Sequence, residues 1–282
     1  MKLLSQIKND MEFNRNLYNL IEVLKEISLS QYHVLEKRVK SFTKVFDVLG
    51  SLLAMISIEN SKHPLLYGGN RQSGVIAVTS DTGLMGGLNL EVMSLAFQEV
   101  EKNKAKLIII GEKGGIYANE SGIPFVAFAG IRDEDRLAQA FELRDYIMNE
   151  EVSLRLGALK IIYPFPISIM AQKVQTLQLL PFAQSSPDVP GSEKDIPGEL
   201  ILESSVEDIA GYLFFLLLGN KFYEIFGLSR LAELSARFVH LEDSKTKIEQ
   251  LNKQLRLQYY RQRHELIDRN IRELFAARMA FR

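Results

Sequence analysis

The sequence predicts an α/β protein: the two ends of the chain form a long antiparallel two-helix coiled coil, and the middle forms a doubly wound, mostly parallel α/β domain. Two observations support this prediction. Glycine and proline interrupt regular structure, and all of them lie between Gly50 and Gly227. Within that interval, short apolar runs that end in turn residues alternate with helical patterns, as they do in βαβ units.

The N-terminal segment has the apolar periodicity of a helix, and we expect residues 1–57 to form the first helix of the coiled coil. A helix from about residue 3 to 57 would be roughly 80 Å long, which is far longer than the ~15 Å radius of a domain of this size. It therefore needs a partner of similar length. Its apolar residues recur at spacings of three and four: Leu17, Leu20, Ile21, Leu24, Ile27, Leu35, Val39, Phe42, Phe46, Leu49 and Leu53.

The C-terminal segment, residues 206–282, is predicted to supply that partner helix. Lys245, Asn252 and Gln262 interrupt its apolar seam, and such polar residues lower stability while they fix the register of two helices. The two terminal helices should therefore bury each other's apolar stripe. The apolar residues of this helix fall mostly at a and d heptad positions: Leu231, Leu234, Phe238, Leu241, Ile248, Leu255 and Tyr259.

The central domain, expected over residues 70–195, is Rossmann-like and is predicted element by element. The last two of its strands are joined by a short connection and should form an antiparallel edge. Residues 183–198 are rich in Pro, Ser and Gly and are expected to be an exposed loop. In chain order we expect strands at 73–81, at 105–114 with its turn, and at 123–130, 156–165 and 173–182, and helices at 91–103 and 134–151.

Composition excludes several classes of protein. The formal net charge is −1, so the whole chain lacks the basic surplus of a nucleic-acid-binding protein, although residues 228–282 carry 12 basic and 7 acidic side chains. There is no cysteine, which excludes disulfides and thiolate metal sites. No run approaches the ~20 apolar residues of a membrane-spanning helix, and the N-terminus lacks the apolar core of a signal peptide. We therefore expect a cytoplasmic protein.

The glycine-rich stretch VTSDTGLMGGLN, residues 78–89, raises the question of a phosphate-binding loop. Its glycines, Gly83, Gly86 and Gly87, fit neither G-x-x-x-x-G-K-[ST] nor G-x-G-x-x-G, so we interpret them as permitting a tight strand-to-helix turn. The 4 histidines have no partner at metal-ligand spacing, and no G-x-S-x-G nucleophile motif occurs. The residues indicate a non-catalytic protein, without cofactor or metal. Such a protein would hold other molecules, keep them at a fixed spacing or transmit movement between them.

Several segments resemble the gamma subunit of rotary F-type ATP synthases, over nearly the full length of the chain. The resemblance begins at HPLLYGG (63–69), includes AVTSDTGLMGGLN and LIIIGEKG, and continues through LKIIYPFPISIMAQKVQTLQLLPF. In the last helix, LAELSARF (231–238) is similar to the family's S-E-x-A-A-R-M, and LQYYRQRHELI (257–267) to its L-x-Y-N-x-x-R-Q-x-x-I. The string S-D-x-G-L-x-G-G-L-N is highly specific to this family.

The resemblance implies a central-stalk rotor subunit with the architecture predicted above. It implies that the coiled coil sits inside a ring of alpha and beta subunits, while the central domain and the foot of the coil rest on the membrane c-ring beside the epsilon subunit. Torque would pass between the alpha/beta ring and the c-ring. The chain would then be peripheral at the cytoplasmic face of a bacterial inner or plasma membrane, held there only by its partners, with no role for nucleic acid.

Contacts with the alpha/beta ring are implied residue by residue. Glu233 and Arg237 match the Glu and Arg of S-E-x-A-A-R-M, and Arg263 matches the Arg of the R-Q pair, which contacts a beta-subunit loop. His264 replaces the Gln of that pair, and Asp268 replaces the Thr of the family's I-T-x-E. The resemblance therefore implies a contact region at the end of the shaft whose side chains differ from the usual ones.

A contact with the c-ring and epsilon subunit at the foot is implied by Glu203, which matches a foot glutamate of the family, although its neighbours differ from the usual aromatic residue and Pro. These departures keep two other interpretations open. One is a non-motor coiled-coil scaffold, or a repurposed homologue, that retained the fold. The other is a small-molecule-binding enzyme that uses the central domain.

Overall fold

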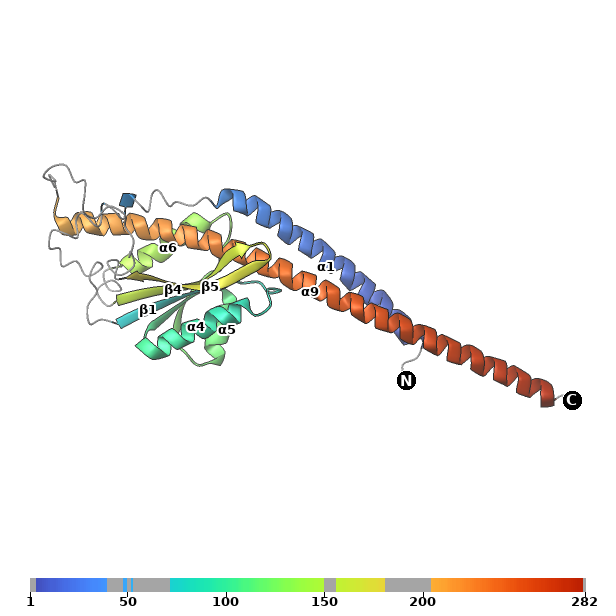
Figure 1. The fold of residues 1–282 in the computed structure, drawn as a ribbon. Helices are drawn as coiled ribbons and strands as arrows, with labels where there is room; N and C mark the ends of the chain where they lie inside the picture. The colour runs from blue at the N-terminus through green and yellow to red at the C-terminus, as the bar shows by residue number, and fades with distance from the viewer. Residues whose placement is uncertain are drawn as a thin grey trace.

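The computed structural model describes residues 4–39, 48, 49, 52, 72–149, 156–180 and 204–280. An α/β domain lies beside one end of a long helical shaft (Figure 1). The shaft consists of α1 (Leu4–Arg38) and α9 (Val206–Ala280), and α9 runs for 75 residues, about 110 Å, without a break. The end of α9 extends beyond α1 as a single helix (Figure 1). The predicted continuation of the first helix to residue 57 lies mostly outside the described residues, as do the loop 183–198 and Glu203.

The central domain contains every predicted strand and helix, with small differences in their bounds, and one helix, α5, that the sequence patterns did not predict. Helix α5 has 9 residues and includes two adjacent glycines, so its helix propensity is low. Between α1 and α9 the elements are β1 (Gln72–Val78), α4 (Leu88–Asn103), β2 (Lys106–Ile110), α5 (Glu112–Glu120), β3 (Phe125–Phe128), α6 (Arg136–Met148), β4 (Leu156–Ser168) and β5 (Ala171–Leu180).

The sheet has the strand order β3-β2-β1-β4-β5. Strands β3, β2, β1 and β4 are parallel, and β5 pairs antiparallel with β4 at the edge, as predicted. Strand β1 is apolar on both faces: Val75 and Ala77 pack with α4, whereas Ile76 and Val78 pack with α6 and α9. Helices therefore cover both faces, which confirms the predicted doubly wound α/β class.

The first third of α9 covers one face of the sheet. Phe214, Phe222 and Phe226 are at most 2% exposed and lie in the same core as the strands and α6. Two glycines of α9 leave room for neighbours, because a Cβ at Gly219 would lie 3.1 Å from Arg144 Cδ of α6 and one at Gly227 would lie 2.9 Å from Val39 Cγ2. The periodicity predicted that α9 would pack on the other terminal helix, and it did not reveal this second partner.

Helix α1 packs along the middle of α9 through a strict seven-residue repeat. Ile7, Asn14, Ile21, Ser28 and Leu35 are its buried residues at that spacing. Ile21 lies in one cluster with Leu241 and Ile248, and Leu35 lies in another with Leu231 and Leu234. The two helices therefore run antiparallel, as predicted.

Two members of the predicted apolar stripe on α1 do not belong to this seam. Leu20 is 55% exposed and Ile27 is 46% exposed. Spacings of three and four admit residues from a neighbouring face of the helix, whereas a coiled coil buries only those that follow a repeat of 3.5. The prediction that Leu20 and Ile27 face the partner helix was therefore wrong.

Two crossed ion pairs join the helices at the middle of the coil. Lys25 Nζ lies 2.7 Å from Glu242 Oε2, and Lys245 Nζ lies 2.9 Å from Glu22 Oε1. The bond from Lys25 holds the pKa of Glu242 below its usual value, and the bond to Glu22 raises the pKa of Lys245. A shift of register would separate both pairs, so Lys245 has a partner that can fix the alignment, the role predicted for polar residues in this seam.

Candidate functional site

The glycine-rich turn between β1 and α4 is held by its own polar side chains. Thr79 Oγ1 donates to the Ile110 carbonyl oxygen (2.7 Å) and accepts from the Gly114 N–H (3.0 Å). The Glu112 N–H donates to Asp81 Oδ1 (2.9 Å), so the first turn of α5 is bonded to this side chain. The N–H groups at the start of α5 are thus bonded to side chains of the β1–α4 turn and are not free to bind a phosphate.

Only one of the three glycines in this turn is required by backbone geometry. Gly86 has φ +60°, in the left-handed region, and a Cβ there would lie 3.7 Å from His240 Nδ1 of the shaft. A Cβ at Gly83 or Gly87 would meet nothing within 4 Å, and neither residue has a positive φ. The interpretation that all three glycines permit the turn therefore holds for Gly86 alone.

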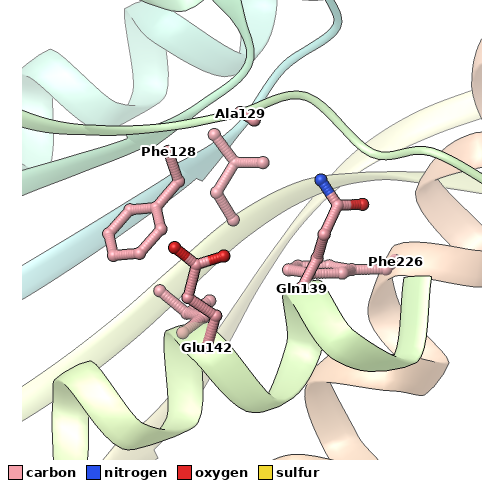
Figure 2. A pocket seen from close by; sticks show the side chains of 7 residues that line it. Phe128, Ala129, Gln139, Glu142 and Phe226 are labelled. Atoms are coloured by element: carbon pink, nitrogen blue, oxygen red, sulfur yellow. The ribbon is translucent and has the colours of Figure 1, made fainter. Parts of the chain in front are cut away.

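The carboxyl edge of the sheet, where doubly wound folds bind ligands, holds a hollow between β2, β3, α6 and α9 (Figure 2). Its free space is about 10 Å³, which corresponds to a single water molecule. The Gln139 amide in the hollow is already bonded, since its Nε2 donates to the Gly130 carbonyl and its Oε1 accepts from the Arg132 N–H, both at 2.8 Å. A nucleotide does not fit there without rearrangement.

The parts of the chain that the structure describes offer neither a metal site nor a membrane-spanning helix. Those parts contain no group of three or more His, Cys, Asp or Glu side chains placed to hold a metal ion. None of their helices has an apolar stretch long enough to cross a bilayer.

A collar of polar residues on α9, Arg230, Glu233, Ser235 and Arg237, joins the shaft to the domain. Glu233 is 3% exposed, and its Oε2 lies 2.7 Å from Arg230 Nη1. Arg230 Nε also lies 3.5 Å from Asp133 Oδ1, in the turn before α6. These contacts place a buried carboxylate and a cation between the shaft and one loop of the domain.

The other collar residues reach two further loops. Arg237 Nη2 donates to Thr82 Oγ1 in the glycine-rich turn (2.6 Å). Ser235 is fully buried, and its hydroxyl lies 3.0 Å from the Ser168 carbonyl oxygen and 2.9 Å from that of Ile169, at the tip of the β4–β5 hairpin. The collar is therefore hydrogen-bonded to two loops of the central domain and forms an ion pair with a third.

Burial dominates the electrostatics of the collar. It raises the pKa of Glu233 above its usual value, although Arg230 and Arg237 oppose that shift. Burial also lowers the pKa of Arg237, with the nearby Arg230 charge acting in the same direction. Removing the Glu233 charge would leave Arg230 and Arg237 close together without the carboxylate that pairs with them, which is costly in a partly buried site.

The residues predicted for partner contact fall into two structural groups. Glu233 and Arg237 are bonded within the chain, as described above. Arg263, His264 and Asp268 are exposed in the last part of α9. The structure thus does not bring the two groups together.

The tip of the shaft carries large apolar side chains as well as these polar ones. Exposed apolar side chains in the last part of α9 favour contact with a partner when they lie together. Eight residues there are between 43% and 81% exposed: Leu257, Tyr260, Leu266, Ile267, Ile271, Leu274, Phe275 and Met279.

Sequence reasoning missed the intramolecular role of the collar. One signal in LSRLAELSARF could have indicated it. Small residues surround the charged ones, and Ser229, Ala232 and Ala236 are at most 2% exposed. Small side chains on several faces of a helix allow other elements to approach it closely, which an exposed helix does not require.

Comparison with known sequences gives one consistent result. A family model described as ATP synthase matches residues 3–281. The ATP synthase gamma chain of Mycoplasmopsis synoviae is 24% identical over 290 residues, which cover 99% of each chain. That of Symbiobacterium thermophilum is 28% identical over 218 residues, which cover 75% of this chain and 74% of the relative.

Solved structures share the fold. A chain of the Euglena gracilis mitochondrial ATP synthase, from its OSCP/F1/c-ring assembly, superposes with a TM-score of 0.69 at 19% identity and covers 99% of this chain and 94% of that one. A chain from the Tetrahymena thermophila mitochondrial ATP synthase central stalk and c-ring gives a TM-score of 0.60 at 18% identity, covering 80% of this chain and 99% of that one. The combination of long shaft and α/β domain therefore occurs in other proteins.

Proposed function

Because the chain belongs to the ATP synthase gamma family, we propose that it is the central-stalk rotor subunit of an F-type ATP synthase. It transmits torque between a catalytic ring of alpha and beta subunits and a membrane c-ring. The observation that carries this proposal is α9, an unbroken helix of 75 residues that joins the α/β domain to a bare tip. One end of such a shaft can be held in a ring while the other end is turned.

The construction of the shaft suits the transmission of torque. The described part of α9 has its only glycines at Gly211, Gly219 and Gly227, where it lies beside the domain, and none beyond. Where α9 leaves the domain, α1 supports it through the heptad seam and the two crossed ion pairs. A helix supported in this way resists bending and twisting better than a single helix.

The tip of α9 is proposed to sit inside the alpha/beta ring. Its exposed apolar residues would be buried there, and Arg263, His264 and Asp268 would meet the ring's polar groups. The surplus of basic residues in 228–282 favours acidic loops on the ring as their partners. A contact at the collar would pass through Arg237, which is partly exposed, because Glu233 is buried and paired.

Asymmetry is the basis of the coupling. Helix α1 covers only one side of α9, so a ring of identical catalytic sites meets a different face of the shaft at each position (Figure 1). Contacts that differ between sites shift each site toward a different conformation and affinity. Rotation exchanges these contacts among the sites, so the chemistry belongs to the ring, and this chain acts as a non-catalytic subunit.

The opposite end of the molecule is proposed to rest on the c-ring, with the epsilon subunit beside it. Glu203 remains the candidate for this contact on the strength of its sequence match alone. In this arrangement the chain is peripheral, at the cytoplasmic face of a bacterial membrane, and is held there through its partners.

Co-purification tests the proposal. The chain, with an affinity tag on its central domain, is produced together with the alpha, beta and epsilon subunits of its own organism. We expect an ATP-hydrolysing complex that contains three alpha, three beta and one copy of this chain. A stable homo-oligomer of this chain alone, recovered while the other subunits assemble without it, would contradict the proposal and favour a scaffold.

A further inference from the structure

The collar contacts the domain from opposite sides of α9. At 3.6 residues per turn, Glu233 and Ser235 point about 200° apart around the helix axis. The Arg230–Glu233–Arg237 cluster reaches the turns at Thr82 and Asp133, whereas Ser235 reaches the hairpin tip. The domain thus holds the shaft from two sides within eight residues of helix.

These contacts differ in kind from the packing around them. Apolar contact is non-directional, so the core positions α9 through the fit of its side chains and not through bonds of fixed direction. Hydrogen bonds depend on direction, and those to charged groups are short. The Ser235 hydroxyl makes its bonds from a fully buried position, whereas the bond from Arg237 to Thr82 lies at the surface. The collar therefore adds bonds of fixed direction that oppose rotation of α9 within the domain, next to the phenylalanine-rich core.

We propose that Glu233 is a positioning residue that locks the central domain to α9 at one rotational setting, so that torque passes between them without slip. The proposal rests on the rotor function above. Glu233 binds Arg230 directly, and its charge balances both Arg230 and Arg237, which in turn hold the loops at Asp133 and Thr82. Without this carboxylate, two neighbouring cations would repel each other and release both loops.

The test uses the complete complex reconstituted in lipid vesicles, with ATP-driven ion uptake measured at equal rates of ATP hydrolysis. Glu233→Gln should lower uptake at least about twofold. Glu99→Gln is the matched control, because Glu99 also forms a half-buried ion pair, 2.7 Å from Lys160, but lies wholly within the central domain. The complex with Glu99→Gln should couple ATP hydrolysis to ion uptake as well as the parent complex does. Ion uptake by the Glu233→Gln complex that equals uptake by the parent complex would overturn the proposal.

A second variant separates positioning from stability. Replacing the cluster by apolar residues, as Arg230→Met, Glu233→Leu and Arg237→Met together, removes the directional bonds and also removes the unbalanced charges that a single substitution leaves. We expect it to regain parental thermal stability while ion uptake stays low. Recovery of uptake together with stability would overturn the proposal, because Glu233 would then serve the fold only.

Thr82 tests the path from the cluster to the domain. Thr82→Val and Arg237→Met should each lower uptake, and the combination should cause no further loss if both break the same bond. Independent, additive losses would overturn the proposal, since Arg237 would then act on another partner. Failure of the parent chain to join the alpha/beta ring would count against the proposed function instead, so the two outcomes are distinguishable.

Discussion

Gly111, at the end of β2, tests whether glycines near the carboxyl edge of the sheet serve packing rather than ligand binding. Its φ is +97°, and a Cβ there would lie 2.7 Å from the Thr79 carbonyl carbon and 3.0 Å from the Ser80 carbonyl carbon. These are backbone atoms at the end of β1, held in place because the Thr79 N–H donates to the Ile110 carbonyl (2.8 Å). The strand end cannot move aside without breaking the sheet.

The cost of Gly111→Ala follows from two contributions. A non-glycine residue held at this φ costs about 1–3 kcal/mol. Overpacking against a fixed backbone adds about 1–3 kcal/mol. The free energy of unfolding should therefore fall by about 2–6 kcal/mol, which corresponds to a drop in Tm of roughly 5–20 °C for a chain of this size.

Gly115 provides a matched control in the same GEKGG run. It lies inside α5, and a Cβ there would make ordinary contacts, 3.5 Å from the Phe125 ring. Alanine is favoured over glycine in a helix by about 0.8–1 kcal/mol, so Gly115→Ala should be neutral or slightly stabilising. Thermal unfolding followed by circular dichroism compares the variants. Equal Tm values for Gly111→Ala and Gly115→Ala would refute the packing account.

Three further predictions concern the shaft. Ile21→Ala should lower the free energy of unfolding by about 2–4 kcal/mol, whereas Leu20→Ala should change it by less than about 0.5 kcal/mol, because only Ile21 is buried. Glu242→Gln should cost about 0.2–1 kcal/mol near neutral pH; since Lys25 lowers the pKa of Glu242, this stabilisation exists above the carboxyl's unfolded pKa and is lost as pH falls through its folded pKa. Arg263→Ala should weaken the coupling of ATP hydrolysis to ion transport and leave the fold intact.

Each of these predictions has a direct measurement. Urea unfolding compares Leu20→Ala with Ile21→Ala, and equal losses would contradict the assigned seam. Unfolding of parent and Glu242→Gln as a function of pH should show a difference that disappears in acid, and a difference that grows in acid would have the wrong sign. For Arg263→Ala, an unchanged Tm should accompany reduced ion uptake, and unchanged uptake would show that this contact is not used.

The features set by local pattern could be predicted from the sequence. The absence of Gly and Pro at both ends, together with the apolar periodicity, predicts the two shaft helices, and the alternation of apolar runs with helical patterns predicts the sheet with its antiparallel edge. These patterns depend on neighbours within a few residues, which is why they can be recognised without the tertiary structure.

Features that depend on tertiary contacts could not be predicted in the same way. Asn14 and Ser28 occupy buried heptad positions that a search for apolar residues passes over. Helix α5 combines low propensity with short length, and it is stabilised by the Asp81 and Thr79 side chains from another segment. Its presence depends on contacts that the sequence pattern does not contain.

The candidate site shows the same division. Arg263, His264 and Asp268 could be assigned to partner contact through the resemblance of their segment to the gamma family, and the structure leaves them exposed. Glu233 could not be recognised as buried, because a glutamate in a helix has the same local pattern whether it faces solvent or a second cation. Its pairing with Arg230 and the contact of Arg237 with Thr82 depend on how the domain folds against the shaft.

Rotation of this chain within its catalytic ring tests the central claim most directly. Because the natural chain has no cysteine, Glu101→Cys, on the exposed part of α4, offers a single point for attaching a bead while the ring is fixed to a surface. The account predicts that ATP drives the bead in one direction with evenly spaced pauses. A complex that hydrolyses ATP while the bead stays still or only fluctuates would contradict it.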